Sequence, residues 1–120
     1  MAIFIIDSKL DLYVSSQEYL HFHHSSLTQG EAILAAGELK TDPLGKILEI
    51  TNSSGHYHPL PKDMIACLDY FHKKGVNLKE VKLKITYEDA GHLYLANYNS
   101  AEGFLLGGLK SLPDNRTLLK

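Results

Sequence analysis

A strict alternation of apolar and polar residues constrains the fold of this chain more than any other feature. The apolar members are Val81, Leu83, Ile85 and Tyr87, and Lys82, Lys84 and Thr86 lie between them. A period of two residues is typical of a strand with one buried face and one face in water. Residues 88–91 supply turn chemistry, and Leu93 and Leu95 alternate with polar neighbours after it. The sequence therefore predicts a β-hairpin here.

A second strand pair is predicted at the start of the chain. Residues 2–6 are mostly β-branched or aromatic, which favours a strand that is buried on both faces. Residues 10–15 alternate between apolar and polar side chains, and the short connection at 7–9 indicates a hairpin. Residues 17–26 mix aromatic and apolar residues with three histidines, and their pattern is ambiguous.

A third strand pair spans residues 32–40 and 46–51. Pro43 presets its own φ and Gly45 accepts a positive φ, so the residues between the two runs predict a tight turn. The first run is rich in small residues and contains Gly37. A glycine inside a strand is typical of a place where another backbone or a large side chain approaches closely. We therefore expect such a contact over Gly37.

One long helix is predicted at residues 61–74. Pro61 suits the first helical position, where its missing N–H would have no partner anyway. Gly75 is a natural stop for the helix. A buried stripe at helical spacing is predicted from Met64, Leu68 and Phe71.

The predicted order of elements places strands in adjacent hairpins with the long helix among them. Short turns between neighbouring strands imply antiparallel pairing, and helices gathered on one face imply the α+β class. We predict an antiparallel sheet of hairpins with one main helix packed on one face. A short helix is expected at 101–109 and a loosely held tail at 112–120. A length of 120 residues fits a single domain, 1–120.

Composition argues against several classes of function. Twelve basic and fourteen acidic residues give a net charge of −2, which argues against a nucleic-acid partner held by phosphate contacts. No apolar run reaches membrane-spanning length, so no membrane partner is expected. Cys67 is the single cysteine, which excludes a disulfide within the chain and fits a reducing, cytoplasmic compartment. On the predicted helix, Cys67 is expected to be a small buried apolar residue.

A polar segment connects the third strand pair to the long helix. It contains Asn52, Ser54, Gly55, His56, Tyr57 and Pro59. Functional sites often lie in such connections. The alternative is a structural corner, in which Asn52 and the serines bond nearby backbone amides and Gly55 adopts a conformation barred to other residues. We favour the structural corner.

Seven histidines raise the question of a metal site. His21 and His23 lie two residues apart, and His56 and His58 repeat that spacing, but no cysteine or obvious acidic ligand accompanies them. A histidine-based metal-dependent hydrolase centred on His23, His24, His56 and His58 is therefore kept as an alternative.

A nucleophilic triad is a second enzymatic reading. It would combine Ser54 or Ser25 with His56 and Glu38, but nothing in the chain matches the Gly-x-Ser-x-Gly elbow. We therefore expect no enzyme activity, no metal and no cofactor.

One set of residues resembles a known module. These residues are His24-Ser25-Ser26, Gly30, Ala36-Gly37-Glu38, Gly45, Asn52 and Ser54-Gly55-His56-Tyr57 with Pro59. The pattern is similar to the SGHY-containing module found in bacterial toxins and effectors. The resemblance covers roughly residues 12–85. It implies a compact β-β-β-α-β unit with no general catalytic role. His58 before Pro59 departs from the usual pattern of the module.

The length and overall pattern of the chain resemble a family of small Legionella inhibitors that act as effectors of effectors. This resemblance implies a protein that binds another bacterial effector, a cysteine-dependent ubiquitin transglutaminase or deamidase, and blocks it sterically. It further implies a homodimer when the protein is alone, and a location in the cytoplasm or, after secretion, in a host cytosol. An immunity protein for a toxin is a further alternative.

Candidate contact residues for such a partner come from the aromatic content. Seven tyrosines and no tryptophan in a small domain suit an amphipathic contact face. The predicted partner-binding residues are Tyr13, Tyr87, Tyr94, Tyr98, His56 and His58. For any single tyrosine, the alternative is an ordinary half-buried strand residue.

Overall fold

The computed structural model of the chain describes residues 2–16, 33–52 and 59–119. Its strands are β1 (Ala2–Asp7), β2 (Leu12–Ser16), β3 (Ile33–Thr41), β4 (Ile47–Thr51), β5 (Lys82–Asp89), β6 (His92–Tyr98) and β7 (Arg116–Leu118). Its helices are α2 (Pro61–Lys73), α3 (Ala101–Gly107) and α4 (Leu112–Asn115), with 3-10 turns η2 (Leu78–Glu80) and η3 (Leu109–Ser111). The ambiguous segment 17–26 and the polar segment 53–58 lie outside the described residues.

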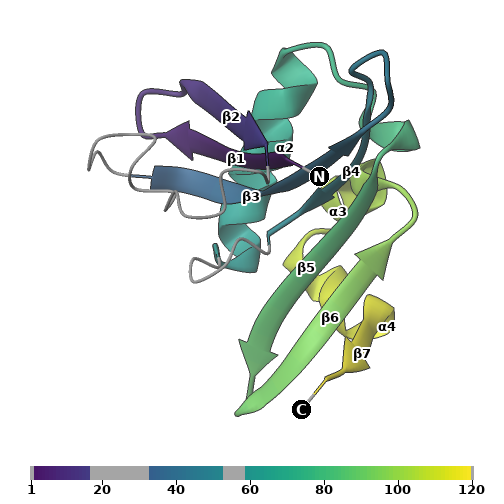
Figure 1. The fold of residues 1–120 in the computed structure, drawn as a ribbon. Helices are drawn as coiled ribbons and strands as arrows, with labels where there is room; N and C mark the ends of the chain where they lie inside the picture. Colours follow the sequence, from purple (N-terminus) through teal and green to yellow (C-terminus); the bar gives the residue numbers. More distant parts are fainter. Residues whose placement is uncertain (1, 17–32, 53–58, 120) are drawn as a thin grey trace.

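The described strands form one seven-stranded sheet in the order β2-β1-β3-β4-β5-β6-β7. β4 and β5 run parallel, and the other neighbouring pairs are antiparallel. α2 connects β4 to β5, because parallel neighbours need a long crossover connection. Figure 1 shows α2 and α3 on the same side of the sheet. The predicted α+β class is confirmed, while the parallel β4–β5 step is a pairing that hairpin reasoning alone does not predict.

The three predicted hairpins are confirmed. β1 pairs with β2, β3 with β4, and β5 with β6. Gly45 closes the β3–β4 turn at a φ of +87°, as expected. In the β5–β6 turn Ala90 and Gly91 both have positive φ, the geometry that matches the twist of two hairpin strands.

The C-terminal residues differ from the expectation of a loosely held tail. α4 and β7 give residues 112–118 regular structure, and β7 pairs with β6 from Ala96–Arg116 to Tyr94–Leu118. α3 ends at Gly107, two residues earlier than predicted, because Gly108 leaves the helical region at a φ of +68°. The single domain 1–120 stays a prediction.

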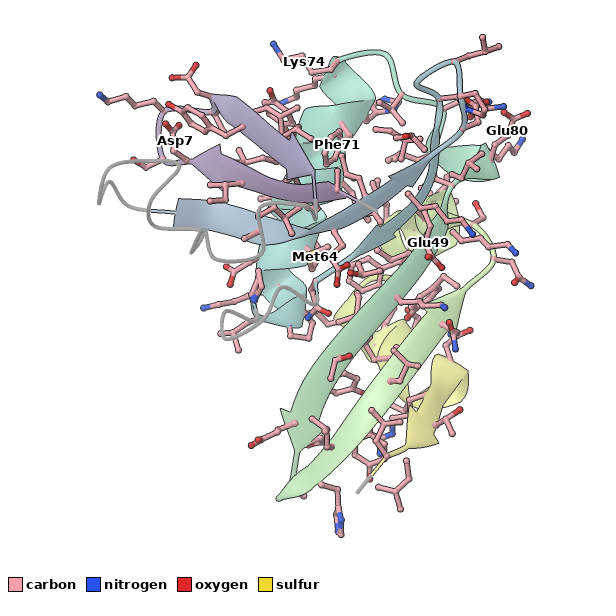
Figure 2. All side chains as sticks on the ribbon, viewed as in Figure 1. Asp7, Glu49, Met64, Phe71, Lys74 and Glu80 are labelled. Atoms are coloured by element: carbon pink, nitrogen blue, oxygen red, sulfur yellow. The ribbon has the colours of Figure 1, made fainter. Side chains whose placement is uncertain are left out.

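The hydrophobic core lies between the sheet and the helices α2 and α3. α2 contributes the buried residues Met64, Cys67, Leu68 and Phe71. Phe4 of β1 meets Phe71 edge-on, with ring centroids 5.6 Å apart. Figure 2 shows Met64 and Phe71 where α2 passes behind the sheet. This packing confirms the predicted stripe and explains why the helix forms, since an amphipathic helix gains most of its stability from burying one face.

Both ends of α2 have the signals that the sequence suggests. The Asp63 carboxylate accepts a hydrogen bond from the N–H of Leu60 at 3.0 Å, so a backbone donor before the first turn is satisfied. Pro61 occupies the first helical position. At the other end, Gly75 takes a φ of +93° and its N–H donates to the carbonyl of His72 at 3.0 Å.

Gly37 of β3 lies directly against the backbone of Thr51 in β4. A Cβ at this position would overlap the carbonyl oxygen of Thr51 and would come within 3.0 Å of the Phe4 ring. The predicted close approach of another backbone is therefore confirmed, and the small residue is a requirement of the fold.

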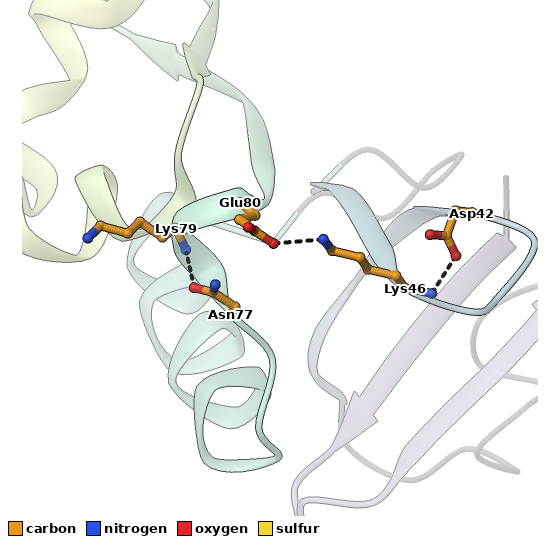
Figure 3. A network of polar contacts seen from close by, with 5 residues as sticks. All are labelled: Asp42, Lys46, Asn77, Lys79 and Glu80. Atoms are coloured by element: carbon orange, nitrogen blue, oxygen red, sulfur yellow. Dashed lines mark hydrogen bonds and ion pairs between the residues drawn. The ribbon is translucent and has the colours of Figure 1, made fainter.

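A polar network links the β3–β4 turn to η2 (Figure 3). The Asp42 carboxylate accepts hydrogen bonds from the N–H groups of Leu44 and Lys46, at 2.9 Å each. The Lys46 ammonium lies 2.7 Å from the Glu80 carboxylate. This contact raises the pKa of Lys46 and lowers the pKa of Glu80.

Within the described ranges, no helix combines the length and the apolar character that crossing a bilayer requires.

Candidate protein-contact surface

The structure brings together two of the residues predicted to bind a partner. Tyr87 on β5 and Tyr94 on β6 are cross-strand partners, with ring centroids 5.9 Å apart. Tyr13 lies on β2, at the opposite end of the sheet. His56 and His58 lie outside the described residues.

Arg116 and Asp89 complete the cluster around the two tyrosines. The Arg116 guanidinium lies over the Tyr94 ring, with its Cζ 3.7 Å from the ring centroid. Its Nη1 donates to the Tyr87 hydroxyl at 3.1 Å and to the Asp89 carboxylate at 2.8 Å. We call these four residues, Tyr87, Asp89, Tyr94 and Arg116, the tyrosine–arginine ledge. Figure 1 shows the turn end of β5 and β6, which carries it, projecting away from α2.

The electrostatics of the ledge keep its cation in one place. The hydrogen bond to Asp89, followed by the one to Tyr87, raises the pKa of Arg116. The Arg116 side chain is 22% exposed, whereas that of Asp89 is 55% exposed. A guanidinium has five N–H groups, and Nη1 supplies two of them. The other three donate to no group within the part of the chain that the structure describes.

Sequence reasoning missed Arg116 and Asp89. The sequence pattern predicts Asp89 as a turn residue and Arg116 as part of the tail. Arg116-Thr117-Leu118 is too short for its alternation to signal a strand, and it becomes one only because β6 offers an unpaired edge.

Tyr98 belongs to the core. Its hydroxyl lies 2.7 Å from the Ser111 hydroxyl and its ring packs on Phe104, with centroids 5.3 Å apart. Burial raises its pKa. Tyr13 is half-buried, and its hydroxyl donates to the Asp7 carboxylate at 3.3 Å. Both tyrosines therefore have structural contacts of their own, apart from the ledge.

Asn52 and Pro59, which flank residues 53–58, are joined by a hydrogen bond from the Asn52 side chain. Asn52 is buried, and its side-chain oxygen accepts the N–H of Thr86 at 2.8 Å. Its amide nitrogen donates to the carbonyls of Thr86 at 2.8 Å and Pro59 at 3.0 Å. Asn52 thus extends the pairing of β4 with β5 by one side chain and fixes both ends of the connection. The expected bonding of Asn52 to backbone groups is confirmed.

The enzymatic alternatives gain no support from the described residues. Cys67 is fully buried, and burial raises the pKa of its thiol, so the reactive thiolate is disfavoured. Its expected role as a small core residue is confirmed. The described ranges hold no group of three or more His, Cys, Asp or Glu residues arranged for a metal. His23, His24, His56, His58, Ser25 and Ser54 lie outside those ranges.

Comparison with known proteins shows that the chain is similar to plant proteins. The family model of the IQ motif-containing protein middle domain matches residues 1–64. The IQ domain-containing proteins IQM2 and IQM3 of Arabidopsis thaliana are 32% identical over 92 residues and 34% identical over 88 residues. These alignments cover 77% and 73% of the chain.

The chain spans only a small part of these relatives, 15% of the length of IQM2 and 19% of the length of IQM3. No solved structure gives a significant match.

These matches overturn the predicted resemblance to the SGHY-containing module and to the small Legionella inhibitors. The predicted inhibition of a bacterial ubiquitin transglutaminase or deamidase is wrong, and so is the predicted effector partner. The homodimer stays a prediction. Several residues quoted for the module are glycine, serine, asparagine or proline, types that many unrelated folds need at turns and close contacts. Gly37, Gly45 and Asn52 serve local geometry of this kind.

The family model covers 64 of 120 residues, and relatives above 30% identity extend over about three quarters of the chain. The chain belongs to the family of IQ motif-containing protein middle domains.

Proposed function

We propose that this chain is a non-catalytic protein-binding domain in a protein of the IQ-motif, calmodulin-binding class. The observation that carries the proposal is the tyrosine–arginine ledge. Tyrosine and arginine are enriched at protein interfaces and among the residues that dominate binding energy. Here two tyrosines and one arginine are already held in contact, so little side-chain entropy remains to be lost when a partner binds.

The Arg116 donors that bond to none of the described residues give the ledge a defined chemistry. Three N–H groups beside two half-buried rings favour a partner that presents carbonyl or carboxylate oxygens next to apolar or aromatic surface. Asp89 keeps the guanidinium oriented when no partner is bound. Cys67, buried in the core, supports a role without nucleophilic chemistry.

The chain does not contain the residue pair that gives the IQ motif its name. Its two glutamines, Gln17 and Gln29, follow serine and threonine. The apolar stripe of α2 is buried against the sheet and cannot serve as a helical target for a groove. We therefore propose that calmodulin-type partners bind elsewhere in the longer family proteins, and that this domain contacts a second protein.

A calmodulin titration tests this division of roles. The chain is titrated with calmodulin in a calorimeter, with calcium and with a chelator, and full-length Arabidopsis IQM2 is titrated in parallel. We expect a complex for IQM2 and none for the chain. A stoichiometric complex between calmodulin and the chain would refute the proposed division.

A capture experiment tests the ledge itself. The chain is used as bait in cells of its own source, in the wild-type form and as Arg116→Ala and Lys82→Ala. Lys82 is exposed on the opposite face of β5, so its substitution is the matched control. We expect partners that bind the wild type and the Lys82 variant but not the Arg116 variant. Thermal melts confirm that all three baits are folded. Equal capture by all three baits would exclude the ledge as the contact surface.

A further inference from the structure

A hollow of about 330 Å³ opens between the β1–β2 turn and the C-terminal half of α2, far from the tyrosine–arginine ledge. Its lining residues are Leu10, Ala66, Asp69, Tyr70, Lys73 and Lys74. Most of the lining surface is apolar, and the charged groups lie on residues of α2 and at its end. The volume lies in the range of sites that bury a small ligand or a few side chains.

Leu10 stands on the rim of this hollow in a strained conformation. It has a φ of +66°, in the left-handed region that disfavours side chains with a Cβ, and it is 55% exposed. Glycine or asparagine at this place would remove the strain. A large apolar side chain that is both strained and exposed adds nothing evident to the core, and strain of this kind gathers at functional sites.

The turn that holds Leu10 is fixed by a buried carboxylate. Asp7 Oδ1 accepts the N–H groups of Lys9 and Asp11, at 2.9 Å each. The N–H of Leu10 donates to the carbonyl of Asp7 at 3.0 Å. The backbone that carries Leu10 is therefore held by hydrogen bonds to Asp7, which is labelled in Figure 2.

The apolar surface continues along β2. Leu12 and Val14 pair with Ile6 and Phe4, so they point to the face of the sheet on which α2 packs. Phe4 and Ile6 are buried there, but Leu12 and Val14 remain exposed beyond the edge of the helix. Together with Leu10 they form an apolar strip that leads from the hollow.

The charges of the lining indicate what would occupy it. The lining itself has one carboxylate and two ammonium groups, a net charge of −1 + 2 = +1, while burial and the nearby Asp11 and Asp7 of the β1–β2 hairpin raise the pKa of Tyr70. Lys73 is paired with Asp69 at 3.0 Å. The Lys74 ammonium lies 5.5 Å from the centre of the Tyr70 ring and makes no ion pair with any described residue. An acidic group on a bound partner would supply the counter-charge.

From these observations we propose that the hollow and the β2 strip bind a segment of a partner protein that carries an apolar side chain next to an acidic one. The apolar side chain enters the hollow beside Leu10, and the acidic one pairs with Lys74. This surface is separate from the tyrosine–arginine ledge, so the proposal does not depend on the proposed function.

The test uses two short peptides with blocked ends, one alternating leucine with glutamate and one alternating leucine with lysine. Each is titrated into the ¹⁵N-labelled chain and followed by amide chemical shifts. We expect the acidic peptide to shift Leu10, Ala66, Tyr70 and Lys74, and the basic peptide to bind at least about tenfold more weakly. Equal affinity for both peptides, or shifts confined to other surfaces, would overturn the proposal.

Two variants separate binding from folding. Leu10→Gly removes the anchor and also relieves the backbone strain, so its melting temperature should equal or exceed that of the wild type while affinity for the acidic peptide falls at least about tenfold. Leu44→Ala, at a 93% exposed leucine on the β3–β4 turn, is the control and should leave the affinity unchanged. Unchanged binding by the Leu10 variant would refute the role of this surface.

Discussion

At the scale of single residues, Gly37 leaves room only for hydrogen beneath the Thr51 carbonyl. We expect Gly37→Ala to lower the free energy of unfolding by about 1–3 kcal/mol, because the added methyl group forces β4 away from β3. Urea denaturation measures the change. Gly103→Ala is the matched control: it lies in α3 with open space around its Cα and should gain about 0.5–1 kcal/mol. Equal effects of the two substitutions would contradict the close contact.

The Asn52 side chain makes three hydrogen bonds to backbone groups at the corner. Asn52→Ala leaves the N–H of Thr86 and the carbonyl of Pro59 without their side-chain partner in a buried place. We expect a loss of about 2–3 kcal/mol in the free energy of unfolding. Asn97→Ala, at an exposed position of β6, should change it by less than about 0.5 kcal/mol. A loss at Asn52 no greater than at Asn97 would argue that the corner is solvated.

These two residues were predictable because their demands are local. A glycine within a strand and an asparagine at a strand end each have few structural explanations. Arg116 was not predictable, since its role depends on Tyr87, Asp89 and Tyr94, which the sheet brings to it from other strands. The strain at Leu10 left no trace in the sequence either, because leucine gives no signal of a positive φ.

At the scale of elements, the β3–β4 turn and η2 are joined by one exposed ion pair. A double-mutant cycle with Lys46→Ala and Glu80→Ala should give only a small coupling energy, because both side chains remain open to water. The coupling should shrink as salt is added. A large coupling that resists salt would mean that the pair is shielded and that this link is a principal support of the sheet.

The helices and strands were largely predictable from hydrophobic periodicity and from the proline and glycine residues at their ends. α2 and the three hairpins carried strong signals in Pro61, Gly75 and the turn glycines. The parallel contact of β4 with β5 did not, because no local pattern tells a strand which distant neighbour it will meet. β7 was not predicted for a related reason. Three residues are too few to show a period, and pairing with the edge of β6 decides their conformation.

At the scale of the whole molecule, Asp7 gives stability a dependence on acid. Hydrogen bonding from the Asp11 N–H, helped by Lys9 and Tyr13, holds the pKa of Asp7 below its ordinary value of 3.8, even though burial acts in the opposite direction. A lowered pKa means that this contribution to stability is complete above the ordinary value and is lost as the pH falls through the folded value.

Asp7→Asn tests this dependence. The amide oxygen can keep the bonds from Lys9 and Asp11, but the group no longer titrates. We expect the variant to lose less stability than the wild type between about pH 5 and pH 2. Urea denaturation at several pH values measures the difference. Curves that run parallel across this range would show that Asp7 does not govern the acid response.

Function at this scale was read wrongly from the sequence, although the fold class was right. Several residues that suggested a bacterial module, such as Gly37, Gly45 and Asn52, report backbone geometry more than descent. Family membership emerged from similarity spread along the chain, which no single motif contains.

The parallel contact between β4 and β5 has a mechanical consequence. Three residue pairs, from Glu49–Lys82 to Thr51–Lys84, join a four-strand group that holds the N-terminus to a three-strand group that holds the C-terminus. Tension between the two ends of the protein must pass through this short ladder and the neighbouring helix. The β6–β7 ladder, which also has three residue pairs and holds the C-terminal strand, bears the same tension, so these two short ladders are stressed before the longer hairpins.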